Sequence, residues 1–413
     1  MSPEDAPLLI VRNVRFHERL LPFRRQDGDG GAAAQAFVRV RIQTETGAEG
    51  WGQAAALLPA ADPDGHRRCL GAAGRHYLDL DMPATAFGAH NEIAGPLAAQ
   101  SDNAGAARFA QGLIDRAVID ALCGIHEMPI ADAVRENLPG IDGAAIPALA
   151  EFDLAAWLGT LTPEESIAVR HRIAADAPIS ADAVSDWLDD GLPETVEEVA
   201  AAYGYQDFTV ALGGDAEADA ERLKELAPVL EPHDYRLMLQ RTVAAGEQPA
   251  DGWWEQVSRT PGLERLRASV IGILDTTEGN IGTICRAEAD LYPSLIDAAL
   301  AVHNGDAALR AADSLAPPGI AVQQQLAWTA LLGIPVAGCT ADAFADGFGG
   351  ASPEEQEGFL LAHPDLYRFE EDATRIRIQD GHAEIGSLAV PGFGCAAEPD
   401  WSSLAEVTYA ADE

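Results

Sequence analysis

The chain is poor in cationic side chains, and in lysine above all. Its 413 residues include 27 lysine and arginine residues against 66 aspartate and glutamate residues, for a formal net charge of −39, and Lys224 is the only lysine. Binding to a nucleic-acid backbone or an anionic membrane surface needs clustered cations, so the composition argues against both. A carboxylate-rich, lysine-poor surface suits a salt-rich cytoplasm, where screening weakens the repulsion between like charges.

Cysteine pairs and long apolar runs are also lacking. The five cysteines lie far apart and form no CxxC pair, which predicts reduced, buried thiols in a cytosol. No apolar run approaches the roughly 20 residues that a membrane span needs. The start, MSPEDAPLLI, lacks the basic segment and long apolar core of a signal peptide. We therefore expect a cytoplasmic protein.

Motifs for nucleotide binding and serine hydrolysis are missing as well. The sequence contains no GxGxxG or Walker pattern and no nucleophile elbow. The pair Gly213-Gly214 lies between an expected strand and an expected helix, where its N–H groups would suit an anion. Asp215 occupies the N-cap position of that helix, however, and we expect its carboxylate to block such use.

The first 140 residues predict a small α+β domain. Residues 8–16 read as a strand, and residues 37–42 alternate apolar and polar side chains before a hairpin turn at Thr46-Gly47. Residues 63–81 and 104–137 have the apolar spacing of packed helices.

After Pro139 short β-like runs alternate with helical segments. Such alternation predicts a parallel α/β sheet, and the length of the chain favours a barrel. The tail contains a hairpin at Asp380-Gly381 that we expect to return to the first domain. We accordingly divide the chain into residues 1–140, 141–375 and 376–413.

Four segments, taken in order, resemble the mandelate racemase/muconate lactonising branch of the enolase superfamily. They are FVRVRIQTETGAEGWGQA, AVIDALCGIHEMPI, DGLPETVEEVAAAYGYQDFTVALGGDAEADAERL and IQDGHAEIGSLAVPGFG. The resemblance implies an N-terminal α+β capping domain over a modified TIM-type (β/α) barrel. It also implies Mg²⁺ held by three carboxylates and abstraction of a proton α to a carboxylate. That chemistry needs a divalent cation to meet the developing charge and a base within reach.

The sequence departs from the family where that chemistry is carried. The Lys-x-Lys pair of the second barrel strand matches Thr209 and Ala211, and the metal-binding Asp of the third strand matches Gln240. A neutral amide is a poor substitute where Mg²⁺ prefers anionic oxygens. The sixth-strand lysine matches Ala289 or Arg286.

The fourth and fifth barrel strands are altered too. Asp275 matches the fourth-strand Glu, with Glu278 close by, and the two form either a residual cation site without a third ligand or a solvated or helix-capping pair. The fifth strand has no match, because only about ten residues separate Asp275 from Arg286, too few for a helix, a strand and a second helix. We therefore expect a shortened, incomplete barrel.

Two other groups have a catalytic and a structural interpretation. His171, in the run IAVRHRI, is either an acid/base group at the barrel mouth or a hydrogen-bonded structural histidine. Residues 323–325, three consecutive glutamines, either line a pocket or form the polar face of a helix.

These features predict an enolase-superfamily homologue that has lost metal-dependent proton abstraction. It would be a binding or assembly subunit without a cofactor, in a homo-oligomer or beside an active paralogue. The alternative is an active lyase, isomerase or racemase with a rearranged site, in which His171, Asp275 and Glu278, with Mg²⁺, act on a carboxylate-bearing small molecule. A third possibility is a metal-free binder of a small ligand in the family's pocket.

Overall fold

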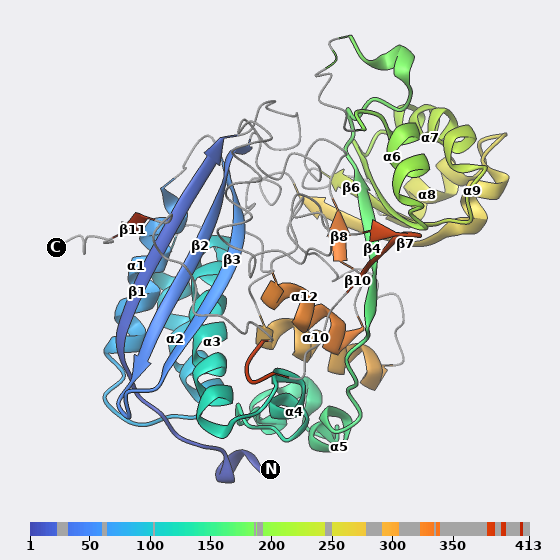
Figure 1. Ribbon diagram of the computed structural model, residues 1–413. Helices are drawn as coiled ribbons and strands as arrows, with labels where there is room; N and C mark the ends of the chain where they lie inside the picture. Colours follow the sequence, from blue (N-terminus) through green and yellow to red (C-terminus); the bar gives the residue numbers. More distant parts are fainter. Residues whose placement is uncertain are drawn as a thin grey trace.

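The structure is a computed structural model with two sheets, each covered by helices on one face (Figure 1). It describes residues 1–22, 32–59, 64–101, 104–185, 187, 193–243, 250–277, 291–304, 323–333, 336–338, 378–384, 390–393 and 405–407. No helix in these ranges has the length and apolar character of a membrane span.

The first sheet is an antiparallel meander with one added strand. It contains β1 (Val11–Pro22), β2 (Ala32–Thr44) and β3 (Glu49–Pro59), and β11 (Ala405–Val407) pairs with the outer side of β1. The predicted alternation of buried and outward-facing side chains in β2 is confirmed. Every second residue is fully buried: Ala36, Val38, Val40 and Ile42. The hairpin between β2 and β3 is also confirmed, with Gly47 at a φ of 84°.

Three helices cover one face of this sheet (Figure 1): α1 (Gly65–Leu78), α2 (Ala86–Gln100) and α3 (Ala104–His126). The helical spacing predicted over residues 104–137 corresponds to two helices, because the chain turns at Glu127, whose φ is 53°, before α4 (Ile130–Arg135). Pro129 is the N-cap residue of α4.

Strand β3 lies directly on α3, and two glycines permit this contact. A Cβ atom on Gly50 would lie 2.1 Å from the carbonyl oxygen of Ala117, and one on Gly52 would lie 2.1 Å from that of Leu113. Both neighbouring atoms belong to the helix backbone and cannot move aside as a flexible side chain would. The run Gly50-Trp51-Gly52 therefore serves strand–helix packing as well as the hairpin.

The second sheet is parallel, as the sequence predicts. Its strands are β4 (Ser166–Ile173), β5 (Asp207–Leu212), β6 (Arg236–Val243), β7 (Val270–Thr277) and β8 (Val336–Gly338). Among these described strands the order is β7-β6-β5-β4-β8. A barrel, whether complete or shortened, stays a prediction.

Helices cover one face of this second sheet: α6 (Val196–Tyr203), α7 (Ala216–Leu230), α8 (Ala250–Ser258) and α9 (Glu264–Ser269). The strand residues facing them are apolar and buried: Ile167, Val169, Ile173, Phe208, Val210, Leu212, Leu237 and Leu239. Successive side chains of a strand point to opposite faces. The intervening residues of β4, β5 and β6 therefore form the inner face of the sheet, away from these helices.

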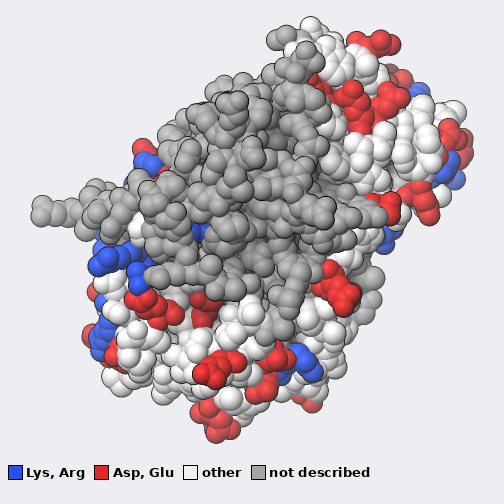
Figure 2. Space-filling view, in the orientation of Figure 1, with Lys and Arg blue, Asp and Glu red and all other residues white. Residues whose placement is uncertain are grey.

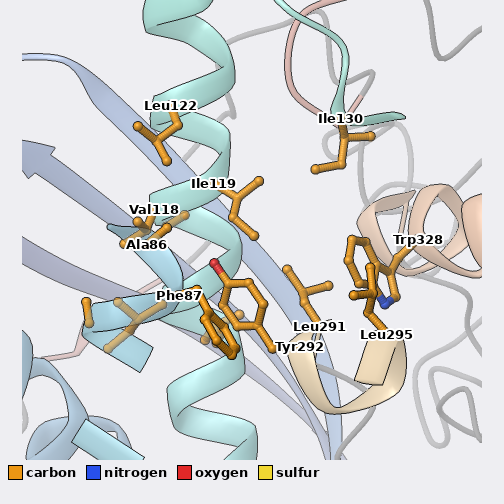
Figure 3. Close-up of a cluster of buried hydrophobic side chains, with 14 of the residues drawn as sticks. Ala86, Phe87, Val118, Ile119, Leu122, Ile130, Leu291, Tyr292, Leu295 and Trp328 are labelled. Carbon is orange, nitrogen blue, oxygen red and sulfur yellow. The ribbon is translucent and has the colours of Figure 1, made fainter. Parts of the chain in front are cut away.

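The core of the first domain extends into the later part of the chain. Helices α5 (Leu154–Leu158), α10 (Leu291–Asn304) and α12 (Gln323–Leu332) contribute buried side chains to the same apolar cluster as α1–α4. Figure 3 shows Tyr292 of α10 beside Phe87 of α2, and Trp328 of α12 beside Leu291 and Leu295 of α10. The expected boundary at residue 140 marks a change of sequence pattern, and this apolar core continues across it.

The predicted C-terminal hairpin forms, but it pairs elsewhere than expected. Strands β9 (Ile378–Gln379) and β10 (His382–Glu384) flank a turn at Asp380-Gly381, where both φ angles are positive. Strand β10 pairs antiparallel with β4 of the second sheet. The return to the first domain is made by Gly392, which bridges Pro129, and by β11.

The contact between β3 and α3 gives a test of packing. We expect Gly52→Ala to lower the free energy of unfolding by about 3 kcal/mol or more, because a methyl group there meets helix backbone. Gly124→Ala is the control, in the helix α3 on which β3 packs; a Cβ at Gly124 meets nothing within 4 Å, and the substitution should raise stability by roughly 0.5–1 kcal/mol. Urea unfolding measures both, and equal effects of the two variants would contradict the packing described.

Candidate functional site

The inner face at the carboxyl ends of the parallel strands is the natural place to look for a site, since ligands bind at that edge in α/β sheets and barrels. The relevant side chains come from neighbouring strands. The register places Arg172 of β4 beside Thr209 of β5, and Ala211 of β5 beside Gln240 of β6.

Arg172 and Gln240 meet across the strand that separates them. The Arg172 Nε atom donates a long hydrogen bond of 3.5 Å to Gln240 Oε1. Their strands are two spacings apart, roughly 10 Å, and the side chains meet because β5 carries only the short Thr209 and Ala211 between them. We call this contact the Arg172–Gln240 bridge.

The amino end of the same face holds a separate charge cluster. Asp207 accepts a hydrogen bond from Arg236 Nη2 at 2.6 Å and lies 3.8 Å from Arg170 Nη2. Burial lowers the pKa of Arg170, and Asp207 acts in the opposite direction. The Asp207 carboxylate is thus placed between two guanidinium groups, away from the carboxyl edge.

Arg172 and Gln240, the pair described at the carboxyl edge, fit Mg²⁺ poorly. Magnesium prefers anionic oxygen ligands, yet Gln240 is neutral and its only acceptor atom, Oε1, receives the Arg172 bond. A guanidinium beside that position would also repel a divalent cation. No group of three His, Cys, Asp or Glu side chains suited to a metal ion occurs among the residues that the structure describes.

The remaining metal candidates are only partly covered by the structure. Asp275 lies in β7 in register with Arg241, whereas Leu274 is the residue in register with Gln240. Arg241 itself lies 5.1 Å from the Trp253 ring, on the helix-covered side of the sheet. Glu278 and the sixth-strand candidates, Arg286 and Ala289, lie outside the described residues.

His171 belongs to the opposite face from the bridge. It is 1% exposed, stacks on Tyr205 with ring centroids 5.2 Å apart, and meets Phe208 edge-on. Burial lowers the pKa of His171 to about 3, so the imidazole is neutral at physiological pH. This placement supports the structural interpretation of His171, although its Nδ1 has no hydrogen-bond partner.

The sequence analysis did not select Arg172 as a candidate site residue, although the alternation of apolar residues around it indicates which face of the sheet it occupies. In IAVRHRI the apolar residues Ile167, Val169 and Ile173 alternate, and His171 falls in their series. The same alternation assigns Arg172 to the other face, together with Arg170. A strict reading of this period would have selected Arg172 over His171 as the candidate facing the site.

The anion site suggested by Gly213-Gly214 is filled by the chain itself. The two backbone N–H groups donate to Asp219 at 2.9 and 3.0 Å, and Trp253 Nε1 donates to the same carboxylate at 3.0 Å. Asp215 does cap α7, accepting from Ala218 N at 2.8 Å. The blocking group is therefore Asp219 and not, as expected, the capping Asp215.

The free edge of β3 is closed by side chains from two helices. Gln324 of α12 accepts from Gln53 N and donates to Trp51 O, both at 2.8 Å. Asp120 accepts from Trp51 N at 3.2 Å, and Arg116 Nη1 donates to Gln53 O at 3.1 Å. Gln324 thus ties α12 to the first sheet instead of lining a pocket; the side chains of Gln323 and Gln325 lie outside the description.

Asp120 is the carboxylate whose shifted pKa most suggests activity, but its surroundings are structural. Burial raises its pKa to about 7, while hydrogen bonds from the backbone N–H groups of Trp51 and Phe393 act in the opposite direction. A Cβ on Gly392 would lie 2.3 Å from its Oδ1 atom, so the C-terminal segment passes directly over it. Asp120 fastens that segment to α3 and β3.

Comparison with known proteins identifies the fold. No protein-family model and no curated protein sequence matches the chain. Among solved structures, a member of the enolase superfamily from Roseovarius nubinhibens, complexed with magnesium, is 15% identical with a TM-score of 0.52, and the match covers 97% of this chain and 99% of that one.

A mandelate racemase/muconate lactonizing enzyme from Bordetella bronchiseptica is also 15% identical, with a TM-score of 0.51 over 95% of this chain and 98% of that one. An isomerase from Streptomyces coelicolor is 13% identical, with a TM-score of 0.50 and coverage of 94% and 97%. The resemblance inferred from the sequence is confirmed at the level of the fold.

The placement of His171 predicts how stability depends on pH. Its pKa is about 3 in the folded chain against an ordinary value of 6.5, so below pH 6.5 the unfolded chain takes up a proton that the folded chain does not. The stability that the buried neutral imidazole contributes is fully present above pH 6.5. Below that pH it decreases as the pH is lowered, by up to about 1.4 kcal/mol per pH unit. As the pH is lowered from 6.5 to 4.5, His171→Phe should therefore lose less stability than the parent chain, as measured by the midpoint of urea unfolding. A constant difference across that range would show that His171 is not buried in its neutral form.

Proposed function

We propose that the protein is a homologue of the enolase superfamily that has lost metal-dependent proton abstraction. It serves as a binding or assembly subunit, in a homo-oligomer or beside an active paralogue. The observation that carries this proposal is the Arg172–Gln240 bridge, which lies over Thr209 and Ala211 at the positions that the resemblance assigns to a catalytic lysine pair and a metal ligand.

The groups at this position are unsuited to acid/base work. A buried lysine can lose its proton and act as a base, whereas a guanidinium stays protonated in proteins. The threonine, alanine and glutamine side chains beside it do not titrate near neutral pH. Lys224 does not contribute either, because it lies on α7 with its Nζ 2.6 Å from Glu221 Oε1.

A magnesium-dependent mechanism would need a different set of ligands. The Roseovarius protein is complexed with magnesium, but Gln240 offers this chain a neutral amide whose oxygen already accepts a hydrogen bond. Asp275 and Glu278 remain the only proposed ligands for the alternative, an active lyase, isomerase or racemase. His171 gives that alternative little support, since it packs between Tyr205 and Phe208 on the helix-covered face.

The surface fits an environment with high salt. Figure 2 shows acidic side chains at many places on the described surface, with fewer basic ones, as expected from the formal net charge of −39. Screening by salt would reduce the repulsion among them. This charge supports the proposal of a salt-rich cytoplasm, and the tests below use concentrated KCl.

Thermal melts with and without divalent cations test the loss of the metal site. In concentrated KCl we expect the same melting temperature in EDTA, millimolar Mg²⁺ and millimolar Mn²⁺. A bound ion at about 100 times its dissociation constant would add about 2.7 kcal/mol of stability. Asp275→Ala, with the exposed Asp182→Ala as matched control, separates specific from surface binding. A rise in the parent chain and in Asp182→Ala that disappears in Asp275→Ala would overturn the proposal in favour of the metal-dependent enzyme.

A further inference from the structure

We propose that a groove on the outer side of the second sheet binds an aliphatic α-amino acid in its zwitterionic form. The groove lies between α7 and the loop that follows β4, and it has a volume of about 830 Å³. Pockets of roughly 300–1,000 Å³ are typical of small-molecule sites. Its walls are Arg222, Glu225 and Val229 of α7 and residues 176–180 and 182–185 of the loop.

The groove is separate from the Arg172–Gln240 bridge. Helix α7 packs on the opposite face of the sheet through three buried leucines: Leu223, Leu226 and Leu230. Each of the three groove residues on α7 directly precedes one of these leucines in the sequence, so the groove residues form a second stripe beside the buried one. The site therefore goes beyond the proposed function and does not depend on what the inner face of the sheet does.

The loop forms a well-bonded wall of the groove. Arg222 Nη2 donates to the carbonyl oxygen of Ala177 and, at 3.4 Å, to that of Ala174. The first turn of α6 donates two backbone N–H groups to the carbonyl oxygens of Pro178 and Ile179, at 3.0 and 3.1 Å. The groove is thus held open between a helix and a hydrogen-bonded segment, and a ligand would not have to order the loop at its own cost.

Arg222 is the group that would bind the carboxylate of the ligand. Burial lowers the pKa of Arg222, while Glu225 and Asp176 act in the opposite direction, so both carboxylates lie near the guanidinium. The loop carbonyls occupy Nη2, and Nε is buried without a hydrogen-bond partner among the described residues. A guanidinium has donors only, on three nitrogens. The donors on Nη1 are therefore left for an acceptor supplied from the groove.

Glu225 provides the opposite charge beside Arg222. The two residues are three positions apart on α7, where helical side chains are neighbours. Within the described part of the chain Glu225 forms no ion pair, since Arg222 turns to the loop carbonyls instead. Asp176 and Asp182 add carboxylates on the loop side. A molecule whose ammonium and carboxylate groups share one carbon atom matches these adjacent opposite charges, whereas a simple amine or acid matches only one of them.

The rest of the lining specifies an aliphatic side chain. Ile179, Val184 and Val229 line the groove, and Ile179 is only 6% exposed. Contact with these side chains removes an aliphatic group of the ligand from water, which favours binding. Charges in a partly buried groove are also screened less by salt than charges on the open surface. The site is thus suited to act in a salt-rich solution.

Calorimetric titration in concentrated KCl with EDTA tests this proposal, with leucine as the probe. Three analogues each lack one of the recognised groups. Isoamylamine lacks the carboxylate, isocaproate lacks the ammonium group, and glycine lacks the aliphatic side chain. We expect leucine to bind and each analogue to bind at least roughly tenfold more weakly.

Variants of α7 locate the site. Glu225→Gln should weaken leucine binding roughly tenfold without changing the melting temperature, because Glu225 is exposed and unpaired in the free protein. Glu217→Gln, the matched control, removes the same charge from an exposed position of the same helix and should leave the dissociation constant unchanged. Arg222→Gln should abolish binding, and Glu225→Gln decides the matter if the loss of the Arg222 bonds to the loop prevents folding.

Three results would overturn the inference: no binding of leucine, binding of any analogue as tight as that of leucine, or equal binding by the parent chain and Glu225→Gln. Each of them would leave the proposed function standing, because the groove and the inner face of the sheet share no residue. The two proposals can therefore fail separately.

Discussion

The contact on which this interpretation depends is one long hydrogen bond between two strands that are not neighbours. Arg172 reaches Gln240 over β5 because Thr209 and Ala211 are short. Longer, cationic side chains on β5 would occupy the same space and repel the guanidinium. The short side chains at positions 209 and 211 and the presence of the bridge are therefore linked features of this face of the sheet.

Close contacts with backbone atoms join the first sheet to helices from both halves of the chain. Gly50 and Gly52 let β3 lie against α3, and Gln324 fastens α12 to the edge of β3 with two hydrogen bonds. Tyr292 of α10 joins the same core, in edge-on contact with Phe87. Helices from the later half of the chain are thus packed against the first sheet and the helices that cover it.

The sequence predicted the repeating elements well, because their signals are local. The alternation in β2, the hairpin at Thr46-Gly47 and the parallel strands each follow from a period of two or from turn chemistry. Arg172 lay within reach of the same reasoning, since IAVRHRI alternates and places His171 with the buried apolar residues.

Other features depend on contacts between distant segments, which no local pattern reveals. Gln324, for example, hydrogen-bonds to Gln53 of β3, which is 271 positions earlier in the chain. The carboxylate that occupies the Gly213-Gly214 N–H groups comes from Asp219, one turn into α7. The pairing of the C-terminal hairpin with β4 was likewise not predictable, because an exposed strand edge accepts any complementary strand.

The most direct test of the central claim is a crystal structure of the protein grown in concentrated KCl and soaked with millimolar Mn²⁺, whose anomalous scattering marks bound ions. We predict no anomalous peak between β4 and β6, with the Arg172 guanidinium in contact with Gln240. An ordered manganese ion at the carboxyl ends of these strands, with Arg172 displaced from Gln240, would contradict the account.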